Sequence, residues 1–371
     1  MKYEFEIAVI GGGLAGLVSS YLLSKSGHEV VLIEKKSYPF HRVCGEYLSN
    51  EALGFLKTHG LLPEGMELPQ IQTFEFSDTS GQRVQLPLDL GGFGISRFVL
   101  DDWIFQQVRN LGAQCLTGIQ VEDLEFLEKE DRFRLALSNH QEVFANQVIG
   151  AFGKRSKLDK KLGRSFIEKR SPYLGVKYHV RTDYVRDAVA LHNFRGGYCG
   201  LNAIEEGKFN LCYLGDREQL RTYGSIDAME EEVLWKNPIL KKVWTESEFL
   251  FDKPEVITEI NFEPKKPVEN HLLMTGDSAG LITPLCGNGM AMAIHSGILA
   301  VQALETGKSR KEIETAYERL WRGAFEKRLW VGRQVQRLFG SGSSSTFARQ
   351  LIQHLPPVAR VIMKNTHGQA F

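Results

Sequence analysis

The chain has 371 residues, of which 43% are hydrophobic, so it is long enough for two or more packed units with large cores. Its 45 basic and 45 acidic residues give a formal net charge of zero, so we expect no nucleic-acid partner. The five cysteines form no C-x-x-C pair, so we expect neither a metal site nor a disulfide framework.

The first residues carry two acids, Glu4 and Glu6, and lead directly into a predicted strand. They do not resemble a secretory signal, which begins with a basic segment. No run of about 18 apolar residues occurs, which is the length that a membrane-spanning helix needs. These features predict a cytoplasmic protein.

A predicted strand, a glycine-rich turn and a predicted helix follow one another at residues 5–26. Gly11, Gly13 and Gly16 occupy the positions of G-x-G-x-x-G, which allow a tight turn, close approach of a pyrophosphate and close packing of the helix. Leu14 and Ala15 begin the helix, whose free N–H groups and dipole favour phosphate.

A second predicted strand, residues 30–33, ends in Glu34 and Lys35. In dinucleotide-binding folds an acidic side chain about 20 residues beyond the glycines binds a ribose hydroxyl. Strand, glycines, helix, strand and acid are therefore in register. This order predicts a dinucleotide-binding unit rather than a glycine-rich turn between core elements.

The first half of the chain alternates helical and strand patterns, which indicates a parallel sheet with crossover helices. The helices are expected at residues 14–26, 49–58 and 98–111, and further strands at 113–127, 132–138 and 143–150. Residues 172–215 alternate apolar and polar side chains between glycine turns, which indicates an antiparallel sheet. The later elements are a helix at 226–235, a strand at 271–274, and helices from 288 to the end, interrupted at a candidate mobile linker, 340–345, and at Pro356-Pro357.

A second glycine-containing segment follows the strand predicted at 271–274. Asp277 can accept hydrogen bonds from sugar-alcohol hydroxyls, and the Gly-Asn-Gly backbone can present N–H groups to an electron-rich ring edge at the start of a helix. The segment therefore predicts a second ligand cradle. Its residues are Gly276, Asp277, Pro284, Gly287, Asn288 and Gly289.

The two motifs together resemble those of FAD-dependent oxidoreductases with the p-hydroxybenzoate hydroxylase fold, in particular the geranylgeranyl reductase-like branch. The resemblance covers the chain to about residue 305 and is weaker beyond it. It implies that FAD is the cofactor, that Asp277 binds the ribityl chain, and that residues 287–289 lie against the pyrimidine edge of the isoalloxazine.

Three shorter segments are similar to parts of the same family. Residues 42–46, Arg-Val-Cys-Gly-Glu, resemble a loop that runs beside the flavin, which implies that Arg42 neutralises the pyrophosphate. Residues 96–101 resemble an arginine-containing helix start, so Arg97 either contacts FAD oxygens or is a solvated helix-entry arginine. Residues 196–200 resemble the strand that covers the substrate side of the ring. The predicted cofactor-binding residues are Gly11, Gly13, Leu14, Ala15, Gly16, Glu34, Lys35, Arg42, Cys44, Gly45, Arg97, Val121, Gly276, Asp277, Pro284, Gly287, Asn288 and Gly289.

One position departs from the family pattern. The family has an Asp after a strand that reads roughly Val-Ile-Gly-Ala, and this chain has Phe152 there. That Asp is associated with FAD and nicotinamide handling, so NAD(P)H is only a candidate electron donor. Lys154 and Arg155 either attract a nicotinamide phosphate or a reductase partner, or are ordinary surface bases.

The resemblance implies an oxidoreductase that acts on an apolar or aromatic small molecule, and four functions stay open. The Cys-Gly-Glu loop favours geranylgeranyl reductase-like hydride transfer through flavin N5. The alternative is a monooxygenase that uses a flavin hydroperoxide. A halogenase is disfavoured because the Trp-x-Trp-x-Ile-Pro signature is absent, and a non-catalytic electron-transfer flavoprotein is the fourth function.

Four side chains are candidates for catalysis or substrate contact. Glu46 is the acid/base candidate by residue type, and Cys44 either modulates the flavin, donates a proton or is simply packed. His179 and Tyr198 lie on the antiparallel sheet that is expected to cover the ring. Because neighbours on a strand point to opposite faces, only one of Tyr178 and His179 can face the flavin.

The predicted fold is α/β (α+β), with a Rossmann-like FAD-binding domain, an inserted antiparallel-sheet substrate domain and a C-terminal helical region. The FAD-binding domain is expected to comprise residues 1–69, 97–160 and 268–305, the substrate domain 70–96 and 161–267, and the helical region 306–371.

The C-terminal helical region is basic. From residue 320 onward it has eight basic residues and one acid, a local charge of plus seven. Trp321, Phe325, Leu329, Trp330 and Phe339 interleave with these bases. The pattern fits either solvated helix faces or a surface that makes peripheral contact with anionic lipid or an acidic partner.

Overall fold

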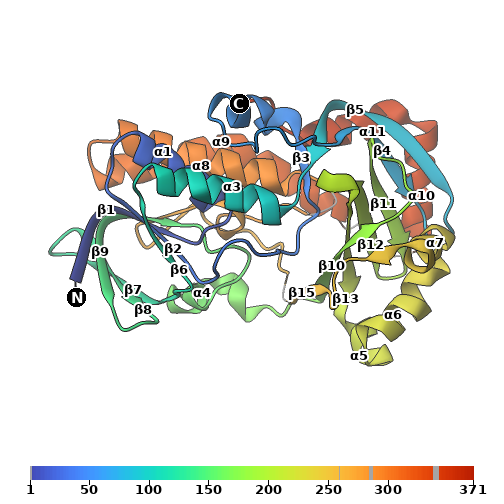
Figure 1. Cartoon of the computed structure of the whole chain (residues 1–371), viewed down its shortest axis with the longest axis horizontal. Coiled ribbons are helices and arrows are strands. Elements are labelled where there is room, and N and C mark those ends of the chain that lie inside the picture. Colours follow the sequence, from blue (N-terminus) through green and yellow to red (C-terminus); the bar gives the residue numbers. More distant parts are fainter. Residues whose placement is uncertain (1, 259, 284–286, 337–341) are drawn as a thin grey trace.

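In the computed structural model, which describes residues 2–258, 260–283, 287–336 and 342–371, two large sheets lie side by side and helices cover them (Figure 1). The strands are β1 (Lys2–Ile10), β2 (Val30–Glu34), β3 (Tyr47–Ser49), β4 (Gln70–Ser77), β5 (Arg83–Gly94), β6 (Gln114–Thr117), β7 (Val121–Leu127), β8 (Arg132–Leu137), β9 (Glu142–Gly150), β10 (Tyr173–Arg181), β11 (Ala188–Phe194), β12 (Gly197–Ala203), β13 (Phe209–Asp216), β14 (Glu248–Phe249), β15 (Glu255–Thr258), β16 (Val268–Glu269) and β17 (Leu272–Met274).

The α-helices are α1 (Leu14–Lys25), α2 (Leu53–Thr58), α3 (Arg97–Asn110), α4 (Lys157–Lys161), α5 (Arg217–Tyr223), α6 (Ile226–Val233), α7 (Pro238–Glu246), α8 (Gly289–Thr306), α9 (Arg310–Gln336), α10 (Gly342–His354) and α11 (Pro356–Thr366). Short 3-10 helices lie at Asn50–Ala52, Ser165–Glu168, Glu205–Gly207, Leu234–Lys236 and Gly276–Ser278.

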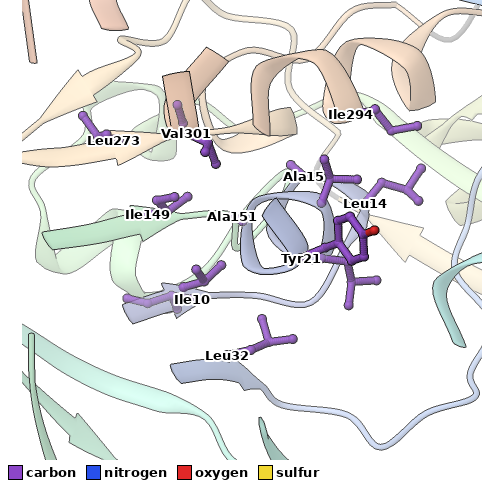
Figure 2. Close-up of a cluster of buried hydrophobic side chains, with 14 of the residues drawn as sticks. Ile10, Leu14, Ala15, Tyr21, Leu32, Ile149, Ala151, Leu273, Ile294 and Val301 are labelled. Atoms are coloured by element: carbon purple, nitrogen blue, oxygen red, sulfur yellow. The ribbon is translucent and has the colours of Figure 1, made fainter. Parts of the chain in front are cut away.

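The first sheet has the strand order β16-β17-β9-β1-β2-β6, and β8 joins β7 to β9. β1 pairs in parallel with β2 and β9, and β17 extends the parallel set beside β9. Helices α1 and α8 pack against each other, and both contribute side chains to the core of this sheet. Figure 2 shows Leu14 and Ala15 of α1 among side chains of β1, β9, β17 and α8, all of them buried. The parallel sheet with crossover helices predicted from the sequence is confirmed.

The second sheet has the order β14-β10-β13-β12-β11-β4-β5-β3, and β15 also pairs with β10. The run β10 to β13 is antiparallel, as predicted for residues 172–215. Helices α6 and α7 bury one face of this run in a core that includes Tyr178, Tyr213 and Trp244. β3 lies in the range predicted for the FAD-binding domain but pairs with β5, because the chain crosses to the second sheet at residue 47.

Two local predictions are corrected by the structure. Residues 49–58 are not one helix, because the strand β3 ends at Ser49 and a 3-10 turn precedes α2. Residues 342–345 do not form a linker but begin α10, and Ser345 is fully buried. Arg349 of α10 forms an ion pair of 2.8 Å with Asp78, which ties the helix to the second sheet. The rest of the predicted linker, residues 340 and 341, lies outside the described residues.

The long helix α9 does not place its apolar residues on a lipid-facing surface, which was one of the two expectations for this region. Trp321, Phe325 and Leu329 are buried in the core of the first sheet and its helices, while Trp330 is 57% exposed. Phe339 lies outside the described residues. The aromatic residues of α9 are therefore mostly core residues rather than a lipid-facing row. No helix in the described parts of the chain has the length and apolarity that spanning a membrane requires.

Candidate functional site

A cavity of about 1070 Å³ lies between the two sheets, at the carboxyl ends of β1, β2 and β9. Ligands of open parallel sheets bind at this edge. Sixteen of the predicted cofactor residues line the cavity: Gly11, Gly13, Leu14, Ala15, Glu34, Lys35, Arg42, Cys44, Gly45, Arg97, Val121, Gly276, Asp277, Gly287, Asn288 and Gly289. Gly16 is buried and does not line the cavity, and Pro284 lies outside the described residues.

The glycine turn after β1 has the close approaches that its spacing predicts. Gly11 has φ +103°, and a Cβ atom there would lie 2.4 Å from the Ala151 carbonyl oxygen. A Cβ atom on Gly16 would lie 1.9 Å from the Gly11 oxygen, so helix and strand meet at that glycine. At Gly13 the nearest protein atom to such a Cβ is Arg97 Nη2, at 3.6 Å. The backbone of Gly13 is therefore open to a ligand.

Two arginines stand beside this turn and share an acid that the sequence analysis missed. Arg97 donates from Nε to Asp101 Oδ1 over 2.6 Å, and Arg42 donates from Nε to Asp101 Oδ2 over 3.0 Å. Burial opposes the charge on Arg97, but Asp101 outweighs it and raises the pKa of Arg97 above its usual value. Arg97 is therefore a charged residue of the cavity wall and not a solvated helix-entry arginine.

Glu34 accepts hydrogen bonds that stabilise the same turn. Its Oε2 accepts hydrogen bonds from the Gly12 N–H, at 2.8 Å, and from Arg42 Nη2, at 3.1 Å. Its Oε1 accepts the Lys36 N–H at 3.0 Å. The carboxylate lies at the end of β2 in the cavity wall, where a ribose is expected, and it also fixes the turn.

The second cradle has donors and acceptors that fit a flavin. Gly276 has φ +57° and donates its N–H to Ser296 Oγ at 2.8 Å, which holds the turn against α8. Asn288 lines the cavity and donates to the Thr366 carbonyl at 3.2 Å. Its buried Oδ1 has no hydrogen-bond partner among the described residues. The two cradles and the arginines therefore fit FAD, and Gly13 and Arg97 are the residues that would hold its diphosphate.

Residues 42–46 cross from the first sheet to the second, and Glu46 anchors the far end. Its Oε1 accepts from Lys177 Nζ at 2.5 Å and from the Arg97 N–H at 2.8 Å, and its Oε2 lies 2.7 Å from His179 Nε2. Burial alone would raise the pKa of Glu46, but Lys177 and His179 lower it to about 2. Glu46 is therefore an ionised carboxylate in a buried ion pair. Its φ of +53° is a left-handed conformation that non-glycine residues rarely adopt.

Amide side chains of the second sheet hold the rest of this loop. Asn210 of β13 donates to the carbonyls of Cys44, at 3.2 Å, and Gly45, at 2.9 Å. Asn202 of β12 donates to the Glu46 carbonyl at 3.5 Å. The sequence analysis missed Lys177, Asn202 and Asn210. Polar residues at alternate positions of otherwise apolar strands were the available signal.

The two predicted substrate residues have different surroundings. Tyr198 lines the cavity. His179 is buried against Glu46 and His41 and is not among the residues that line the cavity in the described part of the chain. Tyr178 points to the opposite face, where its hydroxyl donates to Glu230 at 3.0 Å.

The end of the cavity at the second sheet is apolar. Its walls come from β4, β5, β11, β12, β13 and β15 and from the C-terminal helices α10 and α11, which were expected to close or anchor the site. We call this part the chamber. Its apolar lining side chains are Phe74, Phe76, Leu86, Leu191, Tyr198, Leu214, Ile257, Ile260, Leu281, Ala348, Ile352, Ala359 and Met363. Glu255 lines the same cavity from β15, on the same side of the strand as Ile257.

Phe152 also lines the cavity, at the end of β9 where the related family has an Asp. Lys154 lies beside it and donates to the Val43 carbonyl at 3.4 Å, so it supports the loop. Arg155 is exposed at the cavity margin.

A parallel sheet with a glycine turn at its carboxyl edge, a second cradle and an antiparallel sheet that encloses an apolar chamber define an FAD-binding oxidoreductase. Residues 4–241 match the family model described as FAD binding domain, and the chain belongs to this family.

The chain is also similar to named reductases. It is 27% identical over 345 residues to digeranylgeranylglycerophospholipid reductase of Methanosarcina acetivorans. The matched region covers 87% of this chain and 81% of that protein. It is 22% identical to menaquinone reductase of Mycobacterium tuberculosis, over 97% of this chain and 88% of that protein. A geranylgeranyl bacteriochlorophyll reductase-like protein of Thermoplasma acidophilum has the same fold, with a TM-score of 0.77, 18% identity, and coverage of 98% of this chain and 97% of that one.

Proposed function

We propose that the protein is an FAD-dependent reductase that saturates a C=C bond in an apolar, isoprenoid-like chain. The observation that carries this proposal is the predominantly apolar chamber beside the flavin cradle. Such a wall favours an apolar substrate, because burial of CH₂ groups supplies affinity at about 0.8 kcal/mol per group. When bound, FAD supplies hydride chemistry at N5.

The relatives support the same class of substrate. One is named for the reduction of a digeranylgeranyl lipid and the other for the reduction of menaquinone. Both names denote molecules with a long isoprenoid part.

The residues of the loop divide into positioning and catalytic candidates. Glu46 has a pKa of about 2, so it carries no proton to donate near neutral pH. We assign it to positioning the loop between the two sheets. Cys44 lines the cavity and is the remaining candidate of this loop for donating a proton to the reduced bond.

The test is an anaerobic single-turnover reaction of the chemically reduced holoenzyme with a prenyl alcohol, followed by mass spectrometry. We expect the product to gain two hydrogen atoms while the flavin absorbance returns. If the product instead gains an oxygen atom, and only when oxygen is admitted, the protein is a monooxygenase and the proposal is wrong. Cys44→Ser and Cys44→Ala are the variants to compare, because only the serine keeps a proton to donate.

The electron donor is tested with the same protein. We propose that NAD(P)H reduces the flavin poorly, because Phe152 stands at the position of the family Asp, and that a reductase partner supplies the electrons. Rapid anaerobic bleaching of the flavin by NADPH or NADH alone would contradict this.

A further inference from the structure

Helices α10 and α11 and the residue between them, Leu355, expose four large apolar side chains. Phe347 is 55% exposed, Leu355 52%, Val358 43% and Val361 59%. Isolated apolar residues on a surface are ordinary, but four between residues 347 and 361 make this segment a candidate docking surface. We call these residues the α10–α11 patch.

The segment that carries this patch has charges of one sign. Residues 342–371 contain no Asp or Glu, and Arg360 and Lys364 are exposed on α11 beside the patch. Arg349 is different, because Asp78 neutralises it. An apolar face flanked by unneutralised basic side chains is the composition that binds to an anionic lipid surface.

The same two helices are also a wall of the chamber. Ala348, Ile352, Ala359 and Met363 face inward onto the cavity, and Phe347 both lines the cavity and is exposed. The patch and the chamber are therefore the two sides of one helical layer, and at Phe347 they meet.

We propose that the α10–α11 patch docks on an anionic membrane and that an apolar chain enters the chamber beside Phe347. The path rests on the proposed function, whereas the docking surface does not. Docking there would let the chain move from lipid to protein without crossing water, which avoids exposing its CH₂ groups.

Vesicle co-sedimentation of the purified holoenzyme tests the surface. We expect wild type to bind vesicles of phosphatidylcholine with phosphatidylglycerol, and to bind them more weakly in high salt or without the anionic lipid. The double variant Val358→Glu/Val361→Glu should bind at least about tenfold more weakly, because it places two charges on the apolar face. Arg360→Gln/Lys364→Gln should lose the preference for anionic lipid.

Val185→Glu is the matched control, since Val185 is also exposed, at 46%, but lies in the loop between β10 and β11. It should bind vesicles as wild type does, and all variants should keep their flavin content. The proposal is overturned if wild type does not bind anionic vesicles at low salt, or if Val358→Glu/Val361→Glu binds as well as wild type. Binding to an acidic protein in place of these vesicles would show a different partner and also overturn it.

The entry path is tested separately with substrates in two forms. Val358→Glu/Val361→Glu should reduce a short water-soluble prenyl alcohol at the wild-type rate and lose most activity on a long prenyl chain in vesicles. Equal activity of both proteins on the vesicle substrate would overturn the path. If wild type reduces neither substrate, the proposed function fails, while the vesicle-binding result still decides whether the surface docks.

Discussion

Lys177 Nζ lies 2.5 Å from Glu46 Oε1, and both side chains are fully buried. The pair joins β10 of the second sheet to the loop that borders the flavin cradle. Through the Arg97 N–H it also joins the start of α3. One buried ion pair therefore connects the parts of the protein that enclose the cavity.

We expect Lys177→Met to destabilise the protein by about 3–5 kcal/mol, because it leaves the Glu46 carboxylate buried with one partner fewer. Lys177→Met/Glu46→Gln should recover part of this loss, since neither charge then remains. Urea unfolding of the wild type, both single variants and the double variant measures the coupling. Additive effects of the two substitutions would show that the pair does not act as a unit.

The glycines of the turn after β1 should separate cofactor binding from folding. We expect Gly13→Val to fold and to lose FAD, because the nearest protein atom to a Cβ there is 3.6 Å away and the side chain would occupy the position of the ligand. Gly16→Val should instead fail to fold, because its Cβ would lie 1.9 Å from the Gly11 oxygen. Circular dichroism and flavin content distinguish the two. Normal flavin content in Gly13→Val would contradict the assignment of the turn.

We expect Asp277→Ala to weaken FAD binding by about tenfold to a hundredfold, which is the usual effect of losing a hydrogen bond to a charged group. The Asp277 side chain lines the cavity and makes no side-chain hydrogen bond within the described ranges, so the apoprotein should unfold at nearly the wild-type temperature. Fluorescence titration of the apoprotein with FAD measures the affinity. A lowered melting temperature with unchanged affinity would assign Asp277 to structure instead.

Glu230 should make stability depend on pH. Burial raises its pKa to about 7, although Trp244, Tyr213 and Tyr178 donate hydrogen bonds that lower it. Between about pH 4.5 and 7 the folded protein then binds more protons than the unfolded chain, so stability falls as pH rises, by about 3 kcal/mol in full.

Glu230→Gln should remove this part of the pH dependence, and the exposed Glu231→Gln should leave it unchanged. Urea unfolding at several pH values from 4.5 to about 8 compares the slopes. Parallel curves for wild type and Glu230→Gln would mean that Glu230 is ionised throughout this range.

The sequence by itself determined the cofactor cradle. The strand, the glycines of residues 11–16, the helix and Glu34 are contiguous, and their conformations depend on local backbone geometry. Gly276 and Asp277 likewise follow directly after β17, and the conformation of their turn also depends on local backbone geometry. Their spacing therefore predicted both their structure and their meeting at one edge of the sheet.

Only the tertiary structure decided what surrounds the cradle. Lys177 and Glu46 are 131 residues apart, and Asp101 meets Arg42 across 59 residues. The periodicity of α9 could not show whether Phe325 faces core or lipid, since both surroundings favour the same apolar row. Whether α10 and α11 close the chamber depends on how helices pack on the second sheet. Such long-range packing is a property of the whole fold, which the pattern of a single segment does not specify.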